Sequence, residues 1–493
     1  MAAAIEYVRG MFQWTVKREG IIAPDERPPA VQSVALGVQH IFAMFGATVL
    51  APVIMGFNPN TAIFFSGIGT LIFFIAVRGR VPSYLGSSFS FIAVVVMATG
   101  YAGTGPNANI AVALGGIIAC GAVYALVGLI VMAVGYKWVE FLMPPVVTGA
   151  VVAVIGLNLA PAAINYMKGY AAVADNFGIL VGLITALAVA LVAVYAPGSL
   201  RRLPILVGGV FGYLLYWVLS NVLNLGGTHI DFTAITSAPL LGWPALTAPK
   251  FDSHAITLIV PVAIVLVAEN LGHVKAVAAM TGRDMDPYIG RAFLADGVAT
   301  MVSGSGGGTG VTTYAENIGV MAVTKIYSSL VFVIAAIVAI LLGFSPMFGA
   351  LVLSIPQPVL GGMAVILFGL IATTGIRICV ENKVDFTDNK NFITMAVALT
   401  LGAGNLAITS GDFSMGGIGT ACIAAILVYQ ILNKFGMGKK ANAQIADPGS
   451  PAETKRAAFR PPASSCPRSS AGRSPTPLGL SRTGDRRRRR GPA

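Results

Sequence analysis

The sequence predicts an all-α polytopic membrane protein, with fourteen transmembrane segments arranged as two inverted seven-helix repeats. Three observations support this fold class. Of the 493 residues, 56% are hydrophobic and 11% are charged, and the mean hydropathy is +0.79, which is typical of a chain folded in a bilayer. Apolar runs recur at the length that a spanning helix needs. Basic residues gather in alternate loops between these runs.

Each expected helix is a mostly apolar run, close to the length of about 20 residues that crosses the hydrocarbon core. The third and tenth runs are shorter and follow Gly, Ser and Thr residues. We therefore expect them to be half-helices, each preceded by a short extended stretch. In chain order, the fourteen runs lie at 31–53, 61–77, 84–99, 110–134, 146–163, 175–196, 203–223, 256–279, 288–303, 314–324, 327–344, 358–375, 391–409 and 416–434.

A long outward connection at 224–255 separates a first repeat (31–223) from a second repeat (256–435). Each repeat has an odd number of runs, so the two halves are expected to be inverted in the bilayer. Residues 1–30 lack an early apolar core and are expected to form a cytoplasmic segment without a cleavable signal. With both termini in the cytoplasm, the basic residues follow the positive-inside rule. The inward loops then carry Arg78, Arg80, Lys137, Arg201, Arg202, Lys275, Arg283, Lys325, Arg377, Lys383 and Lys390, and the outward loops carry Lys168 and Lys250.

Residues 436–493 are predicted to be a disordered, basic cytoplasmic tail. From residue 439 onward, 13 Lys and Arg residues face 3 Asp and Glu residues, so the tail supplies most of the net charge of +12. The segment is rich in Pro, Ser and Arg and has no apolar periodicity. Two interpretations remain open, a polybasic contact with anionic lipid headgroups or an extension without function. A nucleic-acid partner is not expected.

The sequence has no pattern of a metal site, a bound cofactor or an ATP-hydrolysing enzyme. No P-loop and no H-E-x-x-H pattern occurs. The cysteines have no paired spacing and the histidines are dispersed. We therefore expect neither a metal nor a cofactor, and no enzymatic activity. The cysteines are Cys120, Cys379, Cys422 and Cys466, and the histidines are His40, His229, His254 and His273.

Matching polar stretches interrupt the third run of each repeat. Residues 84–90 read Tyr-Leu-Gly-Ser-Ser-Phe-Ser, and residues 308–314 read Gly-Thr-Gly-Val-Thr-Thr-Tyr. Interrupted segments at corresponding positions of inverted repeats indicate a substrate site near the bilayer midplane. The two stretches could pair with each other and aim helix N-termini at a ligand. The alternative is that the glycines only allow close helix packing.

Two carboxylates and a histidine lie within apolar segments beside these stretches. Glu269 and His273 are four residues apart and share one helix face, which suits proton-coupled binding. Glu316 begins a half-helix, where the helix dipole favours an anion. The alternatives are a structural hydrogen bond for the first pair and a capping role for Glu316. A small planar ligand with alternating N–H and C=O groups, such as a nucleobase, would complement these acceptors.

Three other polar residues lie in or near the membrane. We expect Asn158 and Asp296 to make helix–helix hydrogen bonds rather than ligand contacts. The role of His40 stays open between packing and proton coupling.

The run from Glu316 to Lys325 resembles the signature [Q/E/P]-N-x-G-x-x-x-x-T-[R/K/G] of the nucleobase–ascorbate transporter family, also called nucleobase:cation symporter 2. Every fixed position matches. The resemblance extends over most of residues 20–435, and includes 39–48, 82–88 and 268–273. It implies a core domain of helices 1–4 and 8–11, a gate domain of helices 5–7 and 12–14, and a homodimer as a family-level expectation.

Within the family, the chain is most similar to bacterial uracil permeases and to a pyrimidine permease of a pyrimidine-degradation pathway. Residues 23–27 and 280–288 carry that closer similarity. It implies a symporter that imports uracil or a related pyrimidine together with a proton across the bacterial inner membrane. The alternatives are a purine or xanthine symporter of the same family, and, less in keeping with the sequence, a nucleobase sensor or a channel.

The resemblance also implies roles for individual residues. Glu269 and Glu316 would accept hydrogen bonds from the uracil ring, and the backbone N–H groups of Phe89 and Ala315 would donate to its carbonyls. Ala47, Phe89 and Tyr314 would pack on the ring. Glu269, His273 and His40 would form the proton-coupling group.

Two positions depart from the uracil permeases that the chain resembles. Ala315 stands where they have Gly, and Phe368 stands where they have an aromatic hydroxyl. We expect Ala315 to narrow the pocket and Phe368 to remove one polar contact. These changes leave open which pyrimidine is the preferred substrate.

Overall fold

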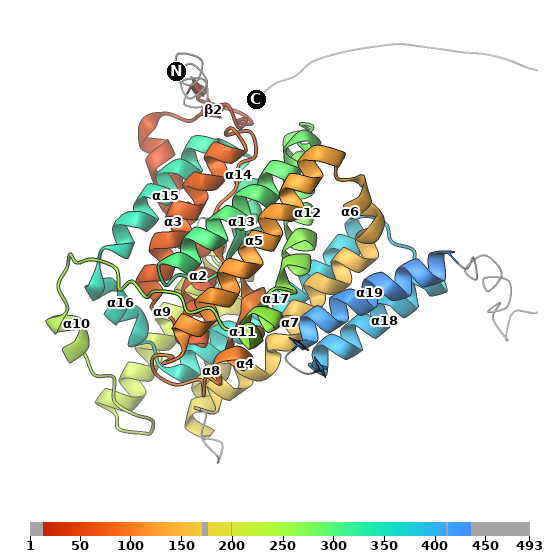
Figure 1. The fold of residues 1–493 in the computed structure, drawn as a ribbon. Helices are drawn as coiled ribbons and strands as arrows, with labels where there is room; N and C mark the ends of the chain where they lie inside the picture. Colours follow the sequence, from red (N-terminus) through yellow and green to blue (C-terminus); the bar gives the residue numbers. More distant parts are fainter. Residues whose placement is uncertain (1–12, 170–175, 199, 411–412, 435–493) are drawn as a thin grey trace, which may run out of the picture. The chain divides into compact units, whose positions relative to one another are not determined.

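Residues 13–434, except 170–175, 199 and 411–412, are described by the computed structural model (Figure 1). The predicted basic tail at 436–493 lies outside them. The elements of the first half are β1 (Thr15–Val16), β2 (Glu26–Arg27), α2 (Ala30–Met55), α3 (Pro59–Ala76), β3 (Leu85–Ser87), η1 (Phe89–Phe91), α4 (Ile92–Thr99), α5 (Ile110–Val134), α6 (Lys137–Leu142), α7 (Pro145–Met167), α8 (Asn176–Tyr195), η2 (Leu200–Arg202), α9 (Pro204–Trp217) and η3 (Val218–Val222).

The second half repeats the order of a long helix, a short strand and a half-helix. Its elements are α10 (Thr233–Ser237), α11 (Ser253–Ile259), α12 (Val262–Thr281), η4 (Asp286–Tyr288), α13 (Ile289–Ser305), β4 (Val311–Thr313), α14 (Ala315–Thr324), α15 (Ser329–Gly343), α16 (Pro346–Leu353), α17 (Gln357–Glu381), α18 (Asn389–Ala403), β5 (Ile408–Ser410), β6 (Phe413–Met415) and α19 (Gly417–Lys434).

The prediction of a mostly helical, multi-pass membrane fold is confirmed. Within the described residues, nine helices are long and apolar enough to cross a membrane, and a tenth results if the bent pair α15–α16 counts as one span. The count of fourteen spans stays a prediction. The extended stretches before the two half-helices are present as β3 and β4.

Local signals set the helix ends. Asn58 caps α3, because its side-chain oxygen accepts from the backbone N–H of Asn60 at 2.9 Å, and Pro59 occupies the first turn. Helix α2 ends at Gly56, whose φ of 73° is the left-handed conformation that glycine adopts without strain.

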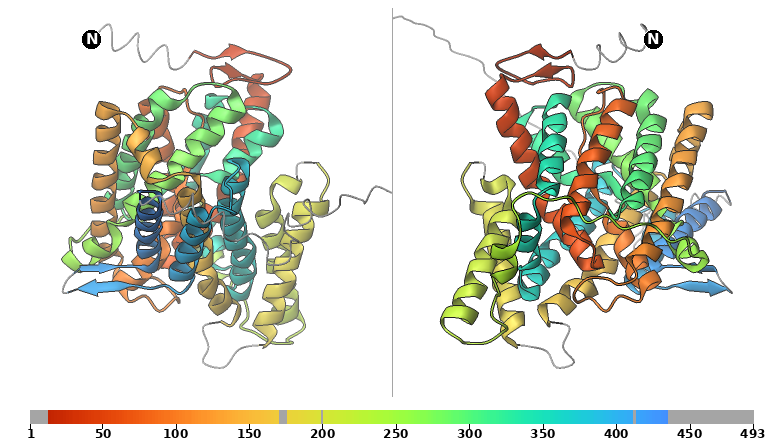
Figure 2. Two further views of the ribbon diagram at one scale, coloured as in Figure 1. Left: turned by 90° about the vertical axis from the view of Figure 1, so that its right-hand side faces the viewer. Right: turned by 60° about the vertical axis from the view of Figure 1, so that its left-hand side comes forward.

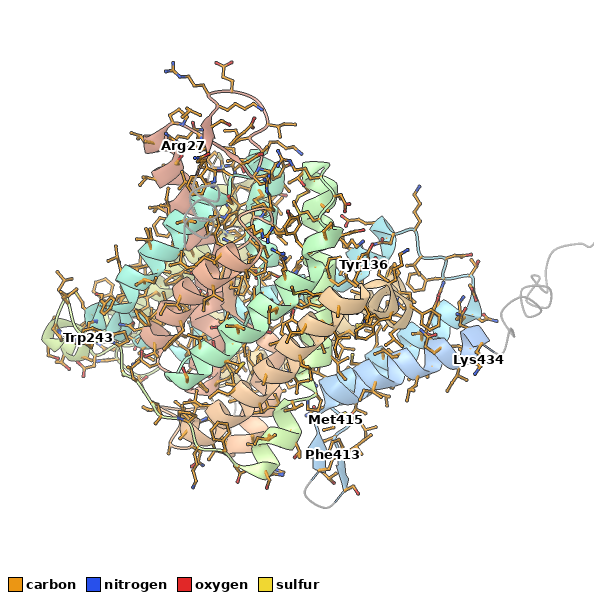
Figure 3. All side chains as sticks on the ribbon, turned by 45° about the horizontal axis from the view of Figure 1, so that its top comes forward. Arg27, Tyr136, Trp243, Phe413, Met415 and Lys434 are labelled. Carbon is orange, nitrogen blue, oxygen red and sulfur yellow. The ribbon has the colours of Figure 1, made fainter. Side chains whose placement is uncertain are left out.

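One predicted run was too long, and one helix was missed. The run 391–409 is not one helix, because α18 ends at Ala403 and Asn405 takes a left-handed φ of 50° before β5 pairs with β6. The run 256–279 lies within the single candidate span Ser253–Thr281, in which a turn at Val260 and Pro261 separates α11 from α12. Helix α16 was not predicted, and it turns by 84° from α15 after Phe344. Figure 3 labels Phe413 and Met415 on the unpredicted hairpin.

The spanning helices pack in two groups. Helices α2, α3, α5, α13 and α15 contact one another, and α7, α8, α9, α17, α18 and α19 form the second group. Helices α4 and α14 pack against the first group, and α12 packs on α5 and α13 of the first group and also contacts α7 and α19 of the second. Glycines bring the central pair of the second group together: a Cβ at Gly375 would lie 2.3 Å from the carbonyl oxygen of Gly149. A side chain at this crossing would force α7 and α17 apart.

An N-terminal segment (residues 13–29) lies across the ends of α14 and α15 (Figure 2). Backbone hydrogen bonds join Ile22 N–H to the Lys325 carbonyl (3.1 Å) and Tyr327 N–H to the Ile22 carbonyl (2.8 Å). The indole of Trp14 donates to the Ser329 hydroxyl at 3.0 Å. The described part of the N-terminal segment is therefore attached to the helix that carries Glu316.

Candidate functional site

Two crossing strands form the centre of the candidate site. Strands β3 and β4 are antiparallel, with Leu85 opposite Thr313 and Ser87 opposite Val311. The ladder continues at both ends, because Ser88 N–H donates to Gly310 O (2.9 Å) and Tyr314 N–H donates to Tyr84 O. Each strand satisfies the backbone of the other, which allows extended chain inside a membrane protein. The pairing that the matched polar stretches suggested is therefore confirmed.

Glycine is required where the strands meet aromatic rings. A Cβ at Gly86 would lie 2.4 Å from the ring of Tyr314, and a Cβ at Gly310 would lie 2.2 Å from the ring of Phe91. The Tyr314 hydroxyl donates to Ser87 O at 2.8 Å and accepts from the Thr48 hydroxyl at 3.1 Å. These contacts fix the Tyr314 ring against the strand crossing.

A small cavity of about 40 Å³ lies beside the strand crossing, where the half-helices begin. Five of the six predicted substrate-binding residues line it, together with His273. They are Glu269, Glu316, Phe89, Ala315 and Tyr314. The sixth, Ala47, is fully buried in α2 and is not among the lining residues. The first backbone N–H groups of a helix have no intrahelical partner, so the starts of η1 and α14 offer donors here.

The two glutamates come from different elements of the second repeat. Glu269 lies on α12, and its Oε2 atom is buried without a hydrogen-bond partner in the described chain. Glu316 lies in the first turn of α14. A buried carboxylate oxygen without a partner costs free energy. The cavity therefore presents an acceptor that a ligand N–H or a proton would satisfy.

His273 links α12 to the strand crossing. Its Nδ1 atom is 2.8 Å from the Thr313 hydroxyl, and one of these two groups donates to the other. The residue is one helical turn after Glu269, and both line the cavity. This geometry places two titratable groups beside one ligand position.

His40 lies outside the cavity lining but contacts the signature segment. The Asn317 amide donates to His40 Nδ1 at 3.0 Å and to the His40 carbonyl at 3.1 Å. The His40 ring also packs on Phe332, with the ring centroids 4.6 Å apart. Both His40 and Asn317 are buried. His40 is thus one residue removed from Glu316 along the chain of contacts.

The helix–helix hydrogen bonds expected for two polar residues are confirmed. The Asn270 amide on α12 donates to Asp296 on α13 at 2.6 Å. The Asn158 amide on α7 donates to the carbonyl of Gly402 on α18 at 2.8 Å. Phe368 is buried and packs edge-to-face on Phe89, with the ring centroids 5.8 Å apart.

Four lining residues were missed by sequence reasoning. Val152 and Ile155 come from α7, and Ile371 and Thr374 come from α17. Three of them are apolar residues in apolar helices, and Thr374 is one of several threonines in such helices. No local signal distinguishes them from lipid-facing or core positions.

A wider space of about 920 Å³, which we call the vestibule, adjoins the site cavity. Its lining includes Arg201 and Arg202 before α9 and Arg377 near the end of α17. A third cavity of about 360 Å³, which we call the opposite cavity, is lined by Asn58, Tyr101 and other residues, and none of them lines the site. In the described part of the chain, no cluster of three or more His, Cys, Asp or Glu side chains could hold a metal ion.

Sequence comparisons give a consistent family assignment. A model described as "Permease family" matches residues 31–411. RutG of Escherichia coli (strain K12), provisionally named a pyrimidine permease, is 57% identical over 429 residues, which cover 86% of this chain and 96% of RutG. The uracil permease of Paenibacillus larvae is 40% identical (85% of this chain and 99% of that protein). The uracil permease of Escherichia coli (strain K12) is 39% identical (84% and 94%).

Solved structures share the fold at low sequence identity. The transmembrane domain of a cyanobacterium bicarbonate transporter, BicA, superposes with a TM-score of 0.57 at 18% identity, covering 80% of this chain and 96% of that one. The structure of SLC26A9 has a TM-score of 0.58 at 13% identity, covering 82% of this chain and 65% of that longer chain. These similarities concern the fold alone.

Proposed function

Because the chain belongs to the Permease family matched over residues 31–411, we propose that it is a proton-coupled symporter for uracil or a related pyrimidine. The observation that carries this proposal is the pair Glu269 and Glu316 at one cavity, beside the starts of two half-helices. Two carboxylate acceptors and free backbone donors complement the alternating N–H and C=O groups of a pyrimidine ring. Relatives that are 57% and 40% identical carry pyrimidine and uracil permease names, which supports the same substrate class.

In the proposed binding mode, Glu269 and Glu316 accept hydrogen bonds from the ring N–H groups. The backbone N–H groups of Phe89 and Ala315 donate to the ring carbonyls. The rings of Phe89 and Tyr314 flank the base; Tyr314 is held by its hydrogen bond to Ser87 O. Ala47 would contribute bulk behind this layer, next to Thr48, which contacts the Tyr314 hydroxyl.

Proton coupling is proposed to involve Glu269 and His273. A proton on Glu269 would neutralise its buried carboxylate, whose Oε2 atom has no partner in the described chain, and would turn an acceptor into a donor toward a ligand. The His273–Thr313 contact would transmit that change to β4, and so to the half-helix that carries Glu316. His40 would take part through Asn317. A ligand or proton shifts a conformational equilibrium only through different affinities for the two states.

Transport is proposed to occur by alternating access between the two helix groups. The group with α2, α3, α5, α13 and α15, together with α4, α12 and α14, would form the core domain, and the group with α7 and α17 would form the gate domain. The site cavity has one wall from α7 and α17 and another from α12, α14 and the strand crossing, which belong to the proposed core domain. Movement of one group along the other would therefore expose the site to each side in turn. Under the positive-inside rule, both termini and the vestibule arginines would lie on the cytoplasmic side of the bacterial inner membrane.

A purine or xanthine symporter is the alternative within the family. Glu at position 316 favours the pyrimidine proposal, because the uracil permeases that the chain resembles also have Glu there. A sensor or channel lacks a supporting observation. Uptake separates a symporter from a sensor or a channel, because a symporter accumulates its substrate and its uptake rate saturates with substrate concentration.

The test is uptake of radiolabelled uracil into permease-deficient cells that express the chain, with and without a protonophore. Saturable uptake that the protonophore abolishes is the expected result, with thymine and xanthine as competitors. Glu269→Gln and Glu316→Gln should each abolish uptake while the protein remains in the membrane. Glu19→Gln, an exposed carboxylate in the N-terminal segment, is the matched control. Wild-type uptake by both site variants would refute the assignment of the site.

A further inference from the structure

The site cavity and the vestibule have only four lining residues in common, and we call these the neck. Ala315 and Glu316 lie at the start of α14, and Ile371 and Thr374 lie on α17. The cavity on one side measures about 40 Å³ and the vestibule on the other measures about 920 Å³. A solute that leaves the site through the vestibule must therefore pass between α14 and α17.

The vestibule lies on the basic side of the molecule. Its lining carries three guanidinium groups, from Arg201, Arg202 and Arg377. Under the positive-inside rule this side faces the cytoplasm. The opposite cavity shares no lining residue with the site. The neck thus connects the site to the cytoplasmic side, on which an imported base is released.

We propose that Ile371 and Thr374 are specificity-determining residues that restrict the release path to a single pyrimidine ring. This inference rests on the proposed function, because it assigns residues to the passage of the same substrate. It adds two side chains to the site that neither the sequence motifs nor the signature segment include.

The positions of the two residues on α17 support this role. They are three residues apart, so their side chains lie on one face of the helix. Helix α17 packs on α7 and α8, whereas α14 contacts α2 and α12. One wall of the neck, α17, therefore belongs to the second helix group, and the other, α14, packs against the first. Any movement of one group along the other changes the width of the neck.

The two side chains would act differently on a passing base. Ile371 supplies apolar bulk. The Thr374 hydroxyl donates to the Leu370 carbonyl at 2.8 Å, which leaves its oxygen lone pairs free to accept from a ring N–H. The neighbouring Thr373 makes the same type of bond to Leu370 O at 3.0 Å but lines neither cavity. Thr373 is therefore a matched control for Thr374.

Bulk at the neck is tested with Ile371→Ala. The ratio of kcat/KM for xanthine to that for uracil should rise by about tenfold or more, the scale of discrimination that one or two methylene groups give in an apolar passage. Leu370→Ala is the control, because Leu370 lines the vestibule but not the neck. An unchanged ratio in Ile371→Ala, or an equal rise in both variants, would overturn the proposal.

Access through the neck is tested by thiol labelling. Thr374→Cys and Thr373→Cys are each made in a background in which the four native cysteines are replaced by Ala. A membrane-impermeant maleimide should label the Thr374→Cys variant in inside-out vesicles and not in right-side-out vesicles. Uracil at about ten times its Kd should slow this labelling about tenfold, because about a tenth of the sites stay free. Labelling of the Thr373→Cys variant should be unaffected by uracil.

The results separate the two proposals. Labelling of the Thr374→Cys variant from the opposite side, or labelling that uracil does not slow in a background that transports uracil, would overturn the neck alone. A wild-type protein that is present in the membrane but neither binds nor transports uracil would overturn the proposed function, and the neck with it.

Discussion

The amide of Asn317 donates to both the ring and the backbone carbonyl of His40, at 3.0 and 3.1 Å. An amide nitrogen can only donate, so His40 Nδ1 accepts and the proton of the neutral ring lies on Nε2. These bonds join α14 to α2, one residue after Glu316. The signature Asn is therefore explained by a bond between two elements rather than by ligand contact.

Removal of this amide should damage both stability and transport. Asn317→Ala leaves the buried Nδ1 of His40 without its donor, which costs about 1–3 kcal/mol. We expect a lower melting temperature in detergent and a large loss of uracil uptake, because Glu316 is displaced with α14. Asn382→Ala is the control, since the Asn382 amide bonds the Ile378 carbonyl at an exposed position. Equal effects of the two variants would contradict the explanation.

A charged cluster joins helix α6 to α12 and to the start of η4. Lys275 on α12 lies 3.0 Å from Glu140 on α6 and 2.8 Å from Asp286, and it lies over the ring of Tyr136 (labelled in Figure 3). On its other side, α6 accepts a hydrogen bond at the Phe141 carbonyl from Gln430 of α19. Helix α6 is therefore joined to α12 on one side and to α19 of the second helix group on the other.

We expect Lys275→Gln to change the rate of transport more than stability. The ion pairs are partly exposed, and such pairs contribute about 0–1 kcal/mol. Loss of the cluster should release α6 and alter kcat for uracil uptake while KM changes little. The comparison is Lys17→Gln, which breaks an ion pair of similar exposure within the N-terminal segment. A change in KM alone would argue against a conformational role.

The N-terminal segment should loosen in acid. The Arg283 side chain, 2.7 Å from Asp25, holds the pKa of that carboxyl below its ordinary value of 3.8, and Arg80 adds to the effect. A lowered folded-state pKa contributes stability above the unfolded-state pKa of about 3.9, and this is lost as pH falls through the folded-state pKa.

The melting temperature tests this prediction. The melting temperature of the wild type should exceed that of Asp25→Asn near pH 7. This difference should shrink as the pH is lowered from about 5 toward about 3, the range around and below the unfolded-state pKa. Glu19→Gln, at an exposed site, reports the effect of removing a carboxylate outside the Asp25–Arg283 pair. A difference that stays constant with pH would exclude the Asp25–Arg283 pair as its source.

The sequence predicted the site best at polar and glycine residues that lie within apolar segments. Glu269, Glu316 and the Gly-rich stretches stand out in apolar segments, and five of the six predicted substrate-binding residues line one cavity. Ile371 and Val152 could not be identified, because an apolar residue in a spanning helix has the same appearance whether it faces lipid, core or cavity. Their position depends on how α7 and α17 pack, which no local pattern encodes.

The prediction of helix boundaries was incomplete for a related reason. Helix α16 consists of apolar residues next to an apolar helix, so composition alone omits it. The β5–β6 hairpin mixes apolar residues with Ser and Thr, and its first strand begins within the run that was predicted for α18. Asn405 marks a break that is clear only once the neighbouring elements are known. Polar insertions in apolar segments were therefore the informative signal, and apolar continuity was not.

The β3–β4 pairing also has a consequence for biosynthesis. Leu85–Ser87 and Val311–Thr313 supply each other's backbone partners, yet they lie in opposite halves of the chain. At about 5–20 residues per second, the ribosome makes Val311 roughly 11–45 s after Ser87. During that interval the first strand is in the membrane without its pairing strand. The nascent chain must therefore shelter these amides with water or with the insertion machinery, and the binding site can form only after the second repeat has entered the bilayer.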